Sequence, residues 1–68
     1  KHYVEIDHKQ AMRNNYEKID RYAELSPIAL KYENHAPFVI FYTTTDERAG
    51  KLEEYMQRKG VKGEVYKK

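Results

Sequence analysis

The feature that most constrains the fold is an unbroken run of β-branched and aromatic residues near the middle of the chain, Phe38-Val39-Ile40-Phe41-Tyr42. A strand of this composition needs cover on both faces, because the side chains on both sides of it are apolar or aromatic. The whole apolar stretch begins at Ala36 and is far shorter than the roughly 20 residues that cross a bilayer. The run therefore predicts the central strand of a sheet, in a chain with no transmembrane segment.

The length and composition limit what surrounds this strand. Sixty-eight residues leave room for one modest core and a single domain. With 40% hydrophobic and 35% charged residues, the chain is too apolar for a typical disordered segment and too polar for a membrane protein. The absence of cysteine excludes a disulfide framework and a thiolate zinc site, so a reducing cytoplasm is the expected location.

The residues before the central run predict a strand and a helix. Residues 2–7 alternate, so that Val4 and Ile6 share one face while Glu5 and Asp7 share the other, which we expect to be the solvent face. From residue 9 to residue 25 the apolar positions recur at three- and four-residue steps, as on one stripe of a helix. We expect Ser26-Pro27 to end this helix, because proline disfavours a helical residue before it. Residues 28–35 are then left as a connection.

The residues after the central run predict a second helix and a last strand. Thr44 and Glu47 have the spacing of a capping box, which starts a helix. Gly60 follows two basic residues and suits a left-handed helix cap. Val61 and Val65 then alternate with polar residues, as in an edge strand.

The order strand–helix–strand–helix–strand predicts a small α/β domain with parallel strands and right-handed crossovers. If the apolar strand is central, the strand order is 1-2-3 and both helices cover one face of the sheet. One alternating set of the central strand then faces outward: either Phe38, Ile40 and Tyr42, or Val39 and Phe41. An absent N-terminal segment, a second copy or the connection 28–35 is needed to cover it.

The sequence offers few groups for chemistry. Glu5 and Asp7 on one strand face could share a divalent cation, with Lys18 as a third member, as in magnesium-dependent nucleases; alternating acids on a strand are more often simply solvated. The histidines lack a metal-ligand spacing and no glycine-rich phosphate loop occurs, so we expect no metal and no cofactor. Basic residues on the helices, represented by Arg13, Lys51 and Arg58, could contact nucleic acid, although a net charge of +2 does not require this.

Several short stretches together carry a family resemblance: Tyr3-Val4-Glu5-Ile6-Asp7, then Lys18-Ile19-x-x-Tyr22, then Phe38-Val39-Ile40-Phe41-Tyr42-Thr43-Thr44, followed by Glu47-Arg48 and Leu52. This pattern resembles the C-terminal part of the replication-relaxation family of plasmids and conjugative elements of Gram-positive bacteria. The resemblance implies a C-terminal piece of a DNA-metabolism accessory protein whose winged helix lies outside the chain. The pattern is also similar to nuclease-like folds, but their Glu-x-Lys reads Glu5-Ile6-Asp7 here.

Three hypotheses follow for the function. The first is a non-enzymatic interaction or assembly domain of a plasmid replication or mobilisation protein, which associates with itself or with the remainder of its parent protein. The second is a degenerate metal-dependent nuclease centred on Glu5, Asp7 and Lys18, and the third is direct nucleic-acid binding through the basic helix faces and the C-terminal tail. The chain opens without an initiator methionine and enters a strand at once, so we expect it to be the C-terminal fragment of a larger protein.

Overall fold

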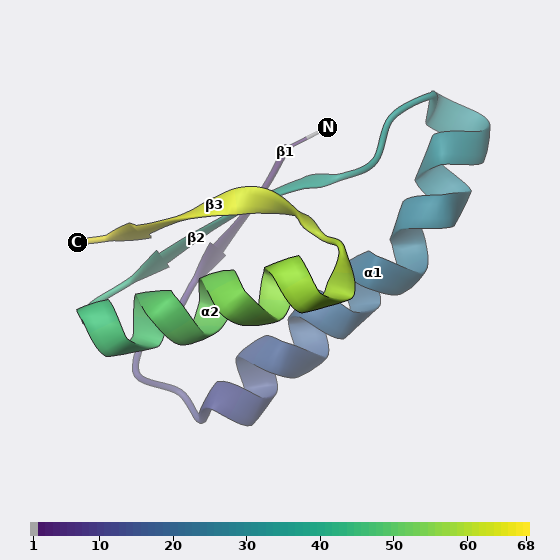
Figure 1. Ribbon diagram of the computed structural model, residues 1–68. Helices are drawn as coiled ribbons and strands as arrows, with labels where there is room; N and C mark the ends of the chain where they lie inside the picture. Colours follow the sequence, from purple (N-terminus) through teal and green to yellow (C-terminus); the bar gives the residue numbers. More distant parts are fainter. Residues whose placement is uncertain (1) are drawn as a thin grey trace.

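The computed structural model describes residues 2–68 as three strands and two helices in alternation (Figure 1). The elements are β1 (His2–Ile6), α1 (Met12–Glu33), β2 (Phe38–Thr43), α2 (Asp46–Lys59) and β3 (Lys62–Lys67). All three strands are parallel, and β2 lies between β1 and β3. The α/β class, the strand–helix alternation and the strand order predicted from the sequence are therefore confirmed.

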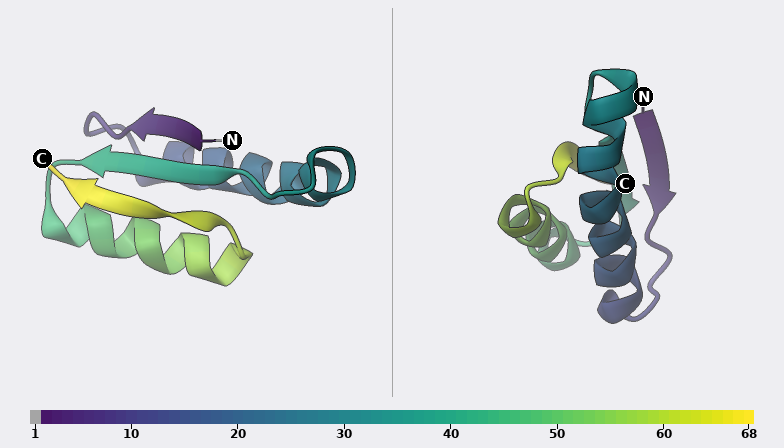
Figure 2. Two further views of the ribbon diagram at one scale, coloured as in Figure 1. Left: turned by 90° about the horizontal axis from the view of Figure 1, so that it is seen from above. Right: turned by 90° about the vertical axis from the view of Figure 1, so that its right-hand side faces the viewer.

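The hydrophobic core lies between one face of the sheet and the two helices. Val39 and Phe41 of β2 are fully buried there, against Ile19 of α1 and Leu52 of α2. Burying each such side chain stabilises the fold by about 1.5–3 kcal/mol. Both helices contact this one face, as predicted for right-handed crossovers, and Figure 2 gives two further views of the arrangement.

Gly63 allows β3 to approach the core closely. A Cβ atom at this position would lie 1.9 Å from the backbone oxygen of Val39, its register partner on β2, and 2.6 Å from Cε of Met56 on α2. Only a residue without a side chain fits such a contact with backbone. Gly63 therefore fixes how near the last strand can lie to both β2 and α2.

The prediction that Ser26-Pro27 ends the first helix is wrong. Helix α1 continues through Pro27 to Glu33 and closes on Asn34, which has the left-handed φ of 65°. Pro27 is exposed and lacks the N–H that would donate to the carbonyl of Ala23, so continuing the helix through it costs one helical hydrogen bond. Residues 28–33 are thus helical, and α1 extends past the end of the sheet (Figure 2).

The start of α1 also differs from the sequence prediction. The helix begins at Met12 rather than at Lys9, because Lys9 has a φ of 60°, a left-handed conformation that a right-handed helix does not contain. Residues 7–11 instead form a loop between β1 and α1. Within residues 2–68, neither helix combines the length and the apolarity that crossing a membrane requires.

The second helix is capped one residue later than the capping-box prediction. Thr45, not Thr44, is the N-cap residue, and its hydroxyl oxygen accepts a hydrogen bond from the backbone N–H of Arg48 at 3.2 Å. The hydroxyl of Thr44 is buried and has no hydrogen-bond partner within residues 2–68. The C-terminal prediction is confirmed, since Gly60 adopts a left-handed φ of 73° and its N–H donates to the carbonyl of Gln57.

Candidate functional sites

The two carboxylates of β1 point toward the helices, so their predicted solvent-facing orientation is wrong. Tyr3 and Glu5 contact side chains of α1 on the core side of the sheet, and Asp7 is buried just beyond the strand. Val4 and Ile6 lie on the opposite, uncovered side and are 58% and 45% exposed. The orientation is reversed because each acid has a cationic partner on a helix.

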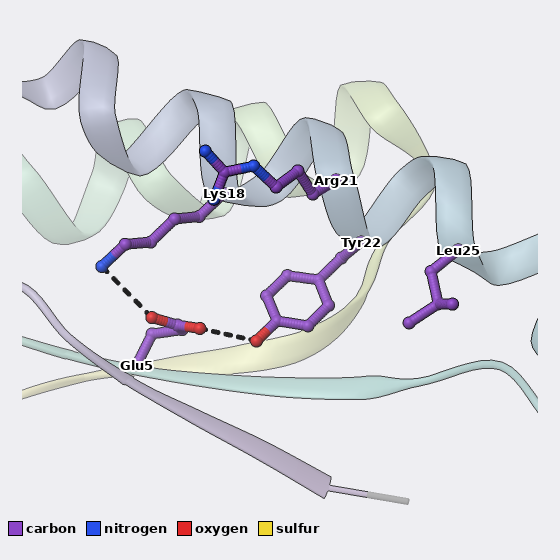
Figure 3. A pocket seen from close by; sticks show the side chains of 5 residues that line it. All are labelled: Glu5, Lys18, Arg21, Tyr22 and Leu25. Atoms are coloured by element: carbon purple, nitrogen blue, oxygen red, sulfur yellow. Dashed lines mark hydrogen bonds and ion pairs between the residues drawn. The ribbon is translucent and has the colours of Figure 1, made fainter.

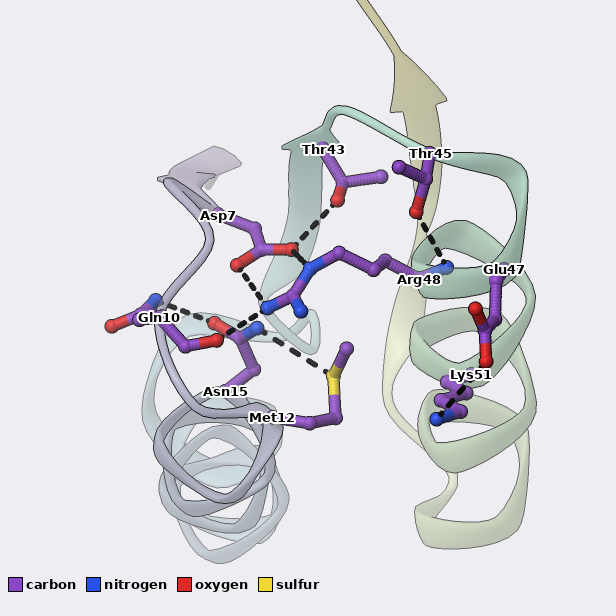
Figure 4. Close-up of polar contacts among 9 residues, drawn as sticks. All are labelled: Asp7, Gln10, Met12, Asn15, Thr43, Thr45, Glu47, Arg48 and Lys51. Carbon is purple, nitrogen blue, oxygen red and sulfur yellow. Dashed lines mark hydrogen bonds and ion pairs between the residues drawn. The ribbon is translucent and has the colours of Figure 1, made fainter.

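Asp7 is the centre of a buried ion pair with Arg48 at the carboxyl ends of β1 and β2 (Figure 4). The guanidinium donates from Nε to Oδ2 at 2.5 Å and from Nη2 to Oδ1 at 2.8 Å. The Thr43 hydroxyl donates to Oδ2 at 2.6 Å. The hydrogen bonds from Arg48 hold the pKa of the Asp7 carboxyl far below its ordinary value of 3.8, although burial acts in the opposite direction.

The same guanidinium joins α2 to the loop before α1. Arg48 Nη2 donates to the backbone oxygen of Gln10 at 2.5 Å, and the Gln10 side chain donates to Asn15 Oδ1 at 2.6 Å. Asn15 is fully buried in the first turns of α1. The cluster therefore connects β1, β2, both helices and the loop between β1 and α1 through one carboxylate. With these hydrogen bonds in place, its geometry is that of a structural clamp.

Glu5 forms a separate pair with α1, beside a pocket of about 230 Å³ (Figure 3). Lys18 Nζ lies 3.2 Å from Oε1, and the Tyr22 hydroxyl donates to Oε2 at 2.6 Å. Arg21 and Leu25 complete the pocket lining. Burial, and then the hydrogen bond to Glu5, raise the pKa of the Tyr22 hydroxyl above its ordinary value of 10.0.

The three residues proposed for a nuclease site, Glu5, Asp7 and Lys18, are thus brought together only in part. Glu5 and Lys18 form an ion pair, whereas Asp7 binds Arg48, so the two carboxylates have different partners. Within residues 2–68, no group of three histidine, cysteine or acidic side chains is placed to hold a metal ion. The metal-dependent nuclease stays a prediction that no contact described here favours.

The uncovered face of the sheet, here called the open face, is formed by the side chains of alternate residues on the three strands. They are His2, Val4, Ile6, Phe38, Ile40, Tyr42, Lys62, Glu64 and Tyr66. The strand register places Val4 beside Ile40 and Ile6 beside Tyr42. Tyr42 and Tyr66 stack with ring centroids 5.7 Å apart. Of the two alternating sets, the structure therefore assigns Phe38, Ile40 and Tyr42 to the open face.

The three basic candidates for nucleic-acid contact lie on exposed helix positions. Lys51 pairs with Glu47 at 3.6 Å and Arg58 with Glu54 at 3.4 Å, each within α2. Arg13 lies in the first turn of α1. Because an acid neutralises the charge of Lys51 and of Arg58 locally, the helix surface gives little concentrated positive potential. DNA binding through these residues stays a prediction.

Sequence reasoning missed the two arginines that shape these sites. Arg48 lies 41 residues from Asp7, and no local pattern links the two. Arg21 was not among the candidate residues, but it lines the Glu5 pocket. Its position three residues after Lys18 was the only available signal, since residues three apart share a helix face.

The comparisons with known proteins found no significant match for this chain among protein-family models, curated proteins or solved structures. The resemblance to the replication-relaxation family therefore stays a prediction.

Proposed function

We propose that this chain is a non-enzymatic interaction domain that associates with a second copy through the open face of its sheet. The observation that carries the proposal is the row of apolar side chains on this face, which neither helix covers. Val4 and Ile6 are exposed, and Phe38, Ile40 and Tyr42 of the central strand are only partly buried. A continuous apolar patch is uncommon on a monomeric protein and marks an interaction surface.

Covering the open face removes apolar surface from water, which stabilises an assembled state. Central strands with apolar side chains on both faces are ordinarily covered on both faces. Each Å² of apolar surface removed from water contributes about 25 cal/mol, so two stacked sheets gain from every row that they cover. Part of that gain is offset by the entropy lost on association, which favours a self-complementary contact that covers the whole face at once.

The side chains of β3 at one side of the open face include one basic and one acidic residue, which favours a second copy as the partner. Lys62 and Glu64 lie two residues apart on this side and are both exposed. A two-fold interface brings the same surface of both copies together, so Lys62 of one copy can face Glu64 of the other. A uniformly charged side would instead repel its copy. The open faces of two copies can therefore meet with apolar side chains in contact and opposite charges facing each other.

The wider setting of the proposal comes from the family resemblance. On that basis, the domain assembles a plasmid replication or mobilisation accessory protein, while DNA recognition belongs to another part of the parent protein. The remainder of that protein is the competing occupant of the open face. An isolated domain that stays monomeric would favour this competing occupant.

Sedimentation equilibrium of the isolated domain tests the proposal. Wild type should self-associate, and Ile40→Asp should remain folded by circular dichroism but become monomeric. Leu30→Asp is the matched control, because Leu30 is an exposed apolar residue on α1, away from the open face. It should associate like wild type. The neighbouring change Val39→Asp places a charge in the core and should unfold the chain, at a cost of several kcal/mol. A monomeric wild type, or equal losses for Ile40→Asp and Leu30→Asp, would rule out the open face as the contact between copies.

A further inference from the structure

We propose that the free edge of β1 binds an extended peptide segment in which apolar and acidic side chains alternate, so that the segment becomes a fourth strand of the sheet. This interaction uses the backbone edge of β1 and the pocket on the helix side of the sheet, and it does not depend on self-association. It rests on three observations: the unpaired edge of β1, the pocket beside that edge, and the charge of the pocket.

The backbone of β1 has free hydrogen-bonding groups on one side. Within the described residues, β1 pairs only with β2. The N–H of Asp7 donates to Tyr42 of β2 at 2.7 Å, and successive residues of a strand direct their backbone groups to alternate sides. The N–H and C=O groups of Val4 and Ile6 therefore point to the free edge. Such an edge can be extended by another strand.

The pocket beside Glu5 lies next to this free edge. In Figure 3 the side chains of Lys18 and Tyr22 extend from α1 toward Glu5 on β1, and Leu25 lies further along the helix. Alternate side chains of an added strand would point to the helix side of the sheet and reach this gap. The pocket thus provides a place for one side chain of the incoming segment.

The charge of the pocket selects an acidic side chain. Its lining holds two cations, Lys18 and Arg21, and one carboxylate, Glu5. Glu5 already binds Lys18 and the Tyr22 hydroxyl, whereas Arg21 forms no ion pair within residues 2–68. A carboxylate from the incoming strand would complement the remaining positive charge. The other alternate residues would lie next to Val4 and Ile6 on the open-face side, where apolar side chains fit.

Two features favour an acidic peptide at the β1 edge over strand addition at β3 or pairing with a second copy. The opposite edge of the sheet, β3, carries Lys62 and Lys67, and edge lysines oppose strand addition. A second copy paired through β1 would place Lys18 and Arg21 of both copies around the same gap, where their like charges repel. An acidic segment at β1 meets neither the edge lysines of β3 nor the repulsion between like charges of two copies.

Fluorescence anisotropy with short labelled peptides tests the proposal. The probe alternates valine and glutamate, and the control peptide alternates valine and lysine. Wild type should bind the glutamate peptide and not the lysine peptide. Arg21→Glu should weaken this binding about tenfold by reversing a charge in the pocket.

A second pair of variants tests strand addition itself. Val4→Pro removes an N–H that faces the free edge and leaves the hydrogen bonds between β1 and β2 in place, so it should abolish binding. Val4→Ala is the matched control, which shortens the same side chain but keeps the donor, and should bind within about threefold of wild type. If Val4→Pro does not fold, peptides methylated on alternate backbone nitrogens replace it, and only one of the two methylation patterns should bind.

Several results would overturn the inference. These are no binding of the glutamate peptide by wild type, equal binding of the lysine peptide, equal effects of Val4→Pro and Val4→Ala, or equal binding of both methylation patterns.

Discussion

Replacing Arg48 with methionine should remove a large part of the stability of this domain. A chain of this size has about 3–10 kcal/mol of unfolding free energy, at roughly 0.05–0.15 kcal/mol per residue. In Arg48→Met, the buried carboxylate of Asp7 loses both guanidinium hydrogen bonds and keeps the one from Thr43. Removing one partner of a buried ion pair costs about 3–5 kcal/mol, because an uncompensated charge remains. Since the Arg48 side chain is 23% exposed, water offsets part of this loss and we expect about 3 kcal/mol.

The pH dependence of this loss identifies its cause. In wild type the pKa of Asp7 lies below its ordinary value of 3.8, so the pair stabilises the fold above that pH and its contribution is lost as the pH falls through and below it. In Arg48→Met the lowering effect of the guanidinium is gone, and burial raises the pKa of Asp7 against the remaining hydrogen bond from Thr43, so the folded variant binds its proton at a higher pH than wild type does. The difference in unfolding free energy should therefore be largest near pH 7 and should shrink on acidification to about pH 3.5.

Urea unfolding followed by circular dichroism at several pH values provides the measurement. Arg58→Met is the matched control, because Arg58 lies on the same helix and, among residues 2–68, pairs only with exposed Glu54. An exposed pair of this kind contributes about 0.5 kcal/mol or less. If Arg48→Met costs no more than Arg58→Met, or if its cost is the same at all pH values, Asp7 and Arg48 are not the clamp described above.

Two further predictions concern the cap of α2 and the glycines. Thr45→Ala should lower the unfolding free energy by about 1 kcal/mol through the lost cap, whereas Thr44→Ala, whose hydroxyl has no partner within residues 2–68, should stay within about 0.5 kcal/mol of wild type. Thermal melts that rank these two variants in the opposite order would move the start of α2 back to Thr44. Gly63→Ala should destabilise the fold severely, since its Cβ would collide with the backbone oxygen of Val39, while Gly50→Ala, in open space on α2, should stabilise by about 0.5–1 kcal/mol. Equal melting temperatures for these two glycine variants would show that β3 does not approach β2 as closely as described.

The central strand was the part of the fold most readily predicted from sequence. Its apolar run predicts β2 as the middle strand, and alternation separates Val39 and Phe41 from Ile40. Alternation alone could not say which set faces the helices. That choice depends on contacts with Ile19 and Leu52, which are distant in sequence.

The errors in the prediction arose where one local pattern has two meanings. Ser26-Pro27 is typical of a helix end, yet serine followed by proline also suits the first turn of a helix, and here the chain stays helical. Thr44 and Thr45 both offer a capping hydroxyl, and only the backbone conformation selects Thr45. On β1, an alternation of apolar and acidic residues suggested buried Val4, because the partners of the acids lie on helices that sequence alone does not place.

The central claim is that the open face of the sheet binds a second copy, and methyl NMR spectra recorded over a dilution series test it most directly. The methyl signals of Val4, Ile6 and Ile40 should shift together as the protein is diluted, because these side chains leave the interface. The signals of Ile28 and Leu30, exposed on the far end of α1, should stay constant over the same series. Shifts confined to Ile28 and Leu30, or spectra independent of concentration, would contradict the account.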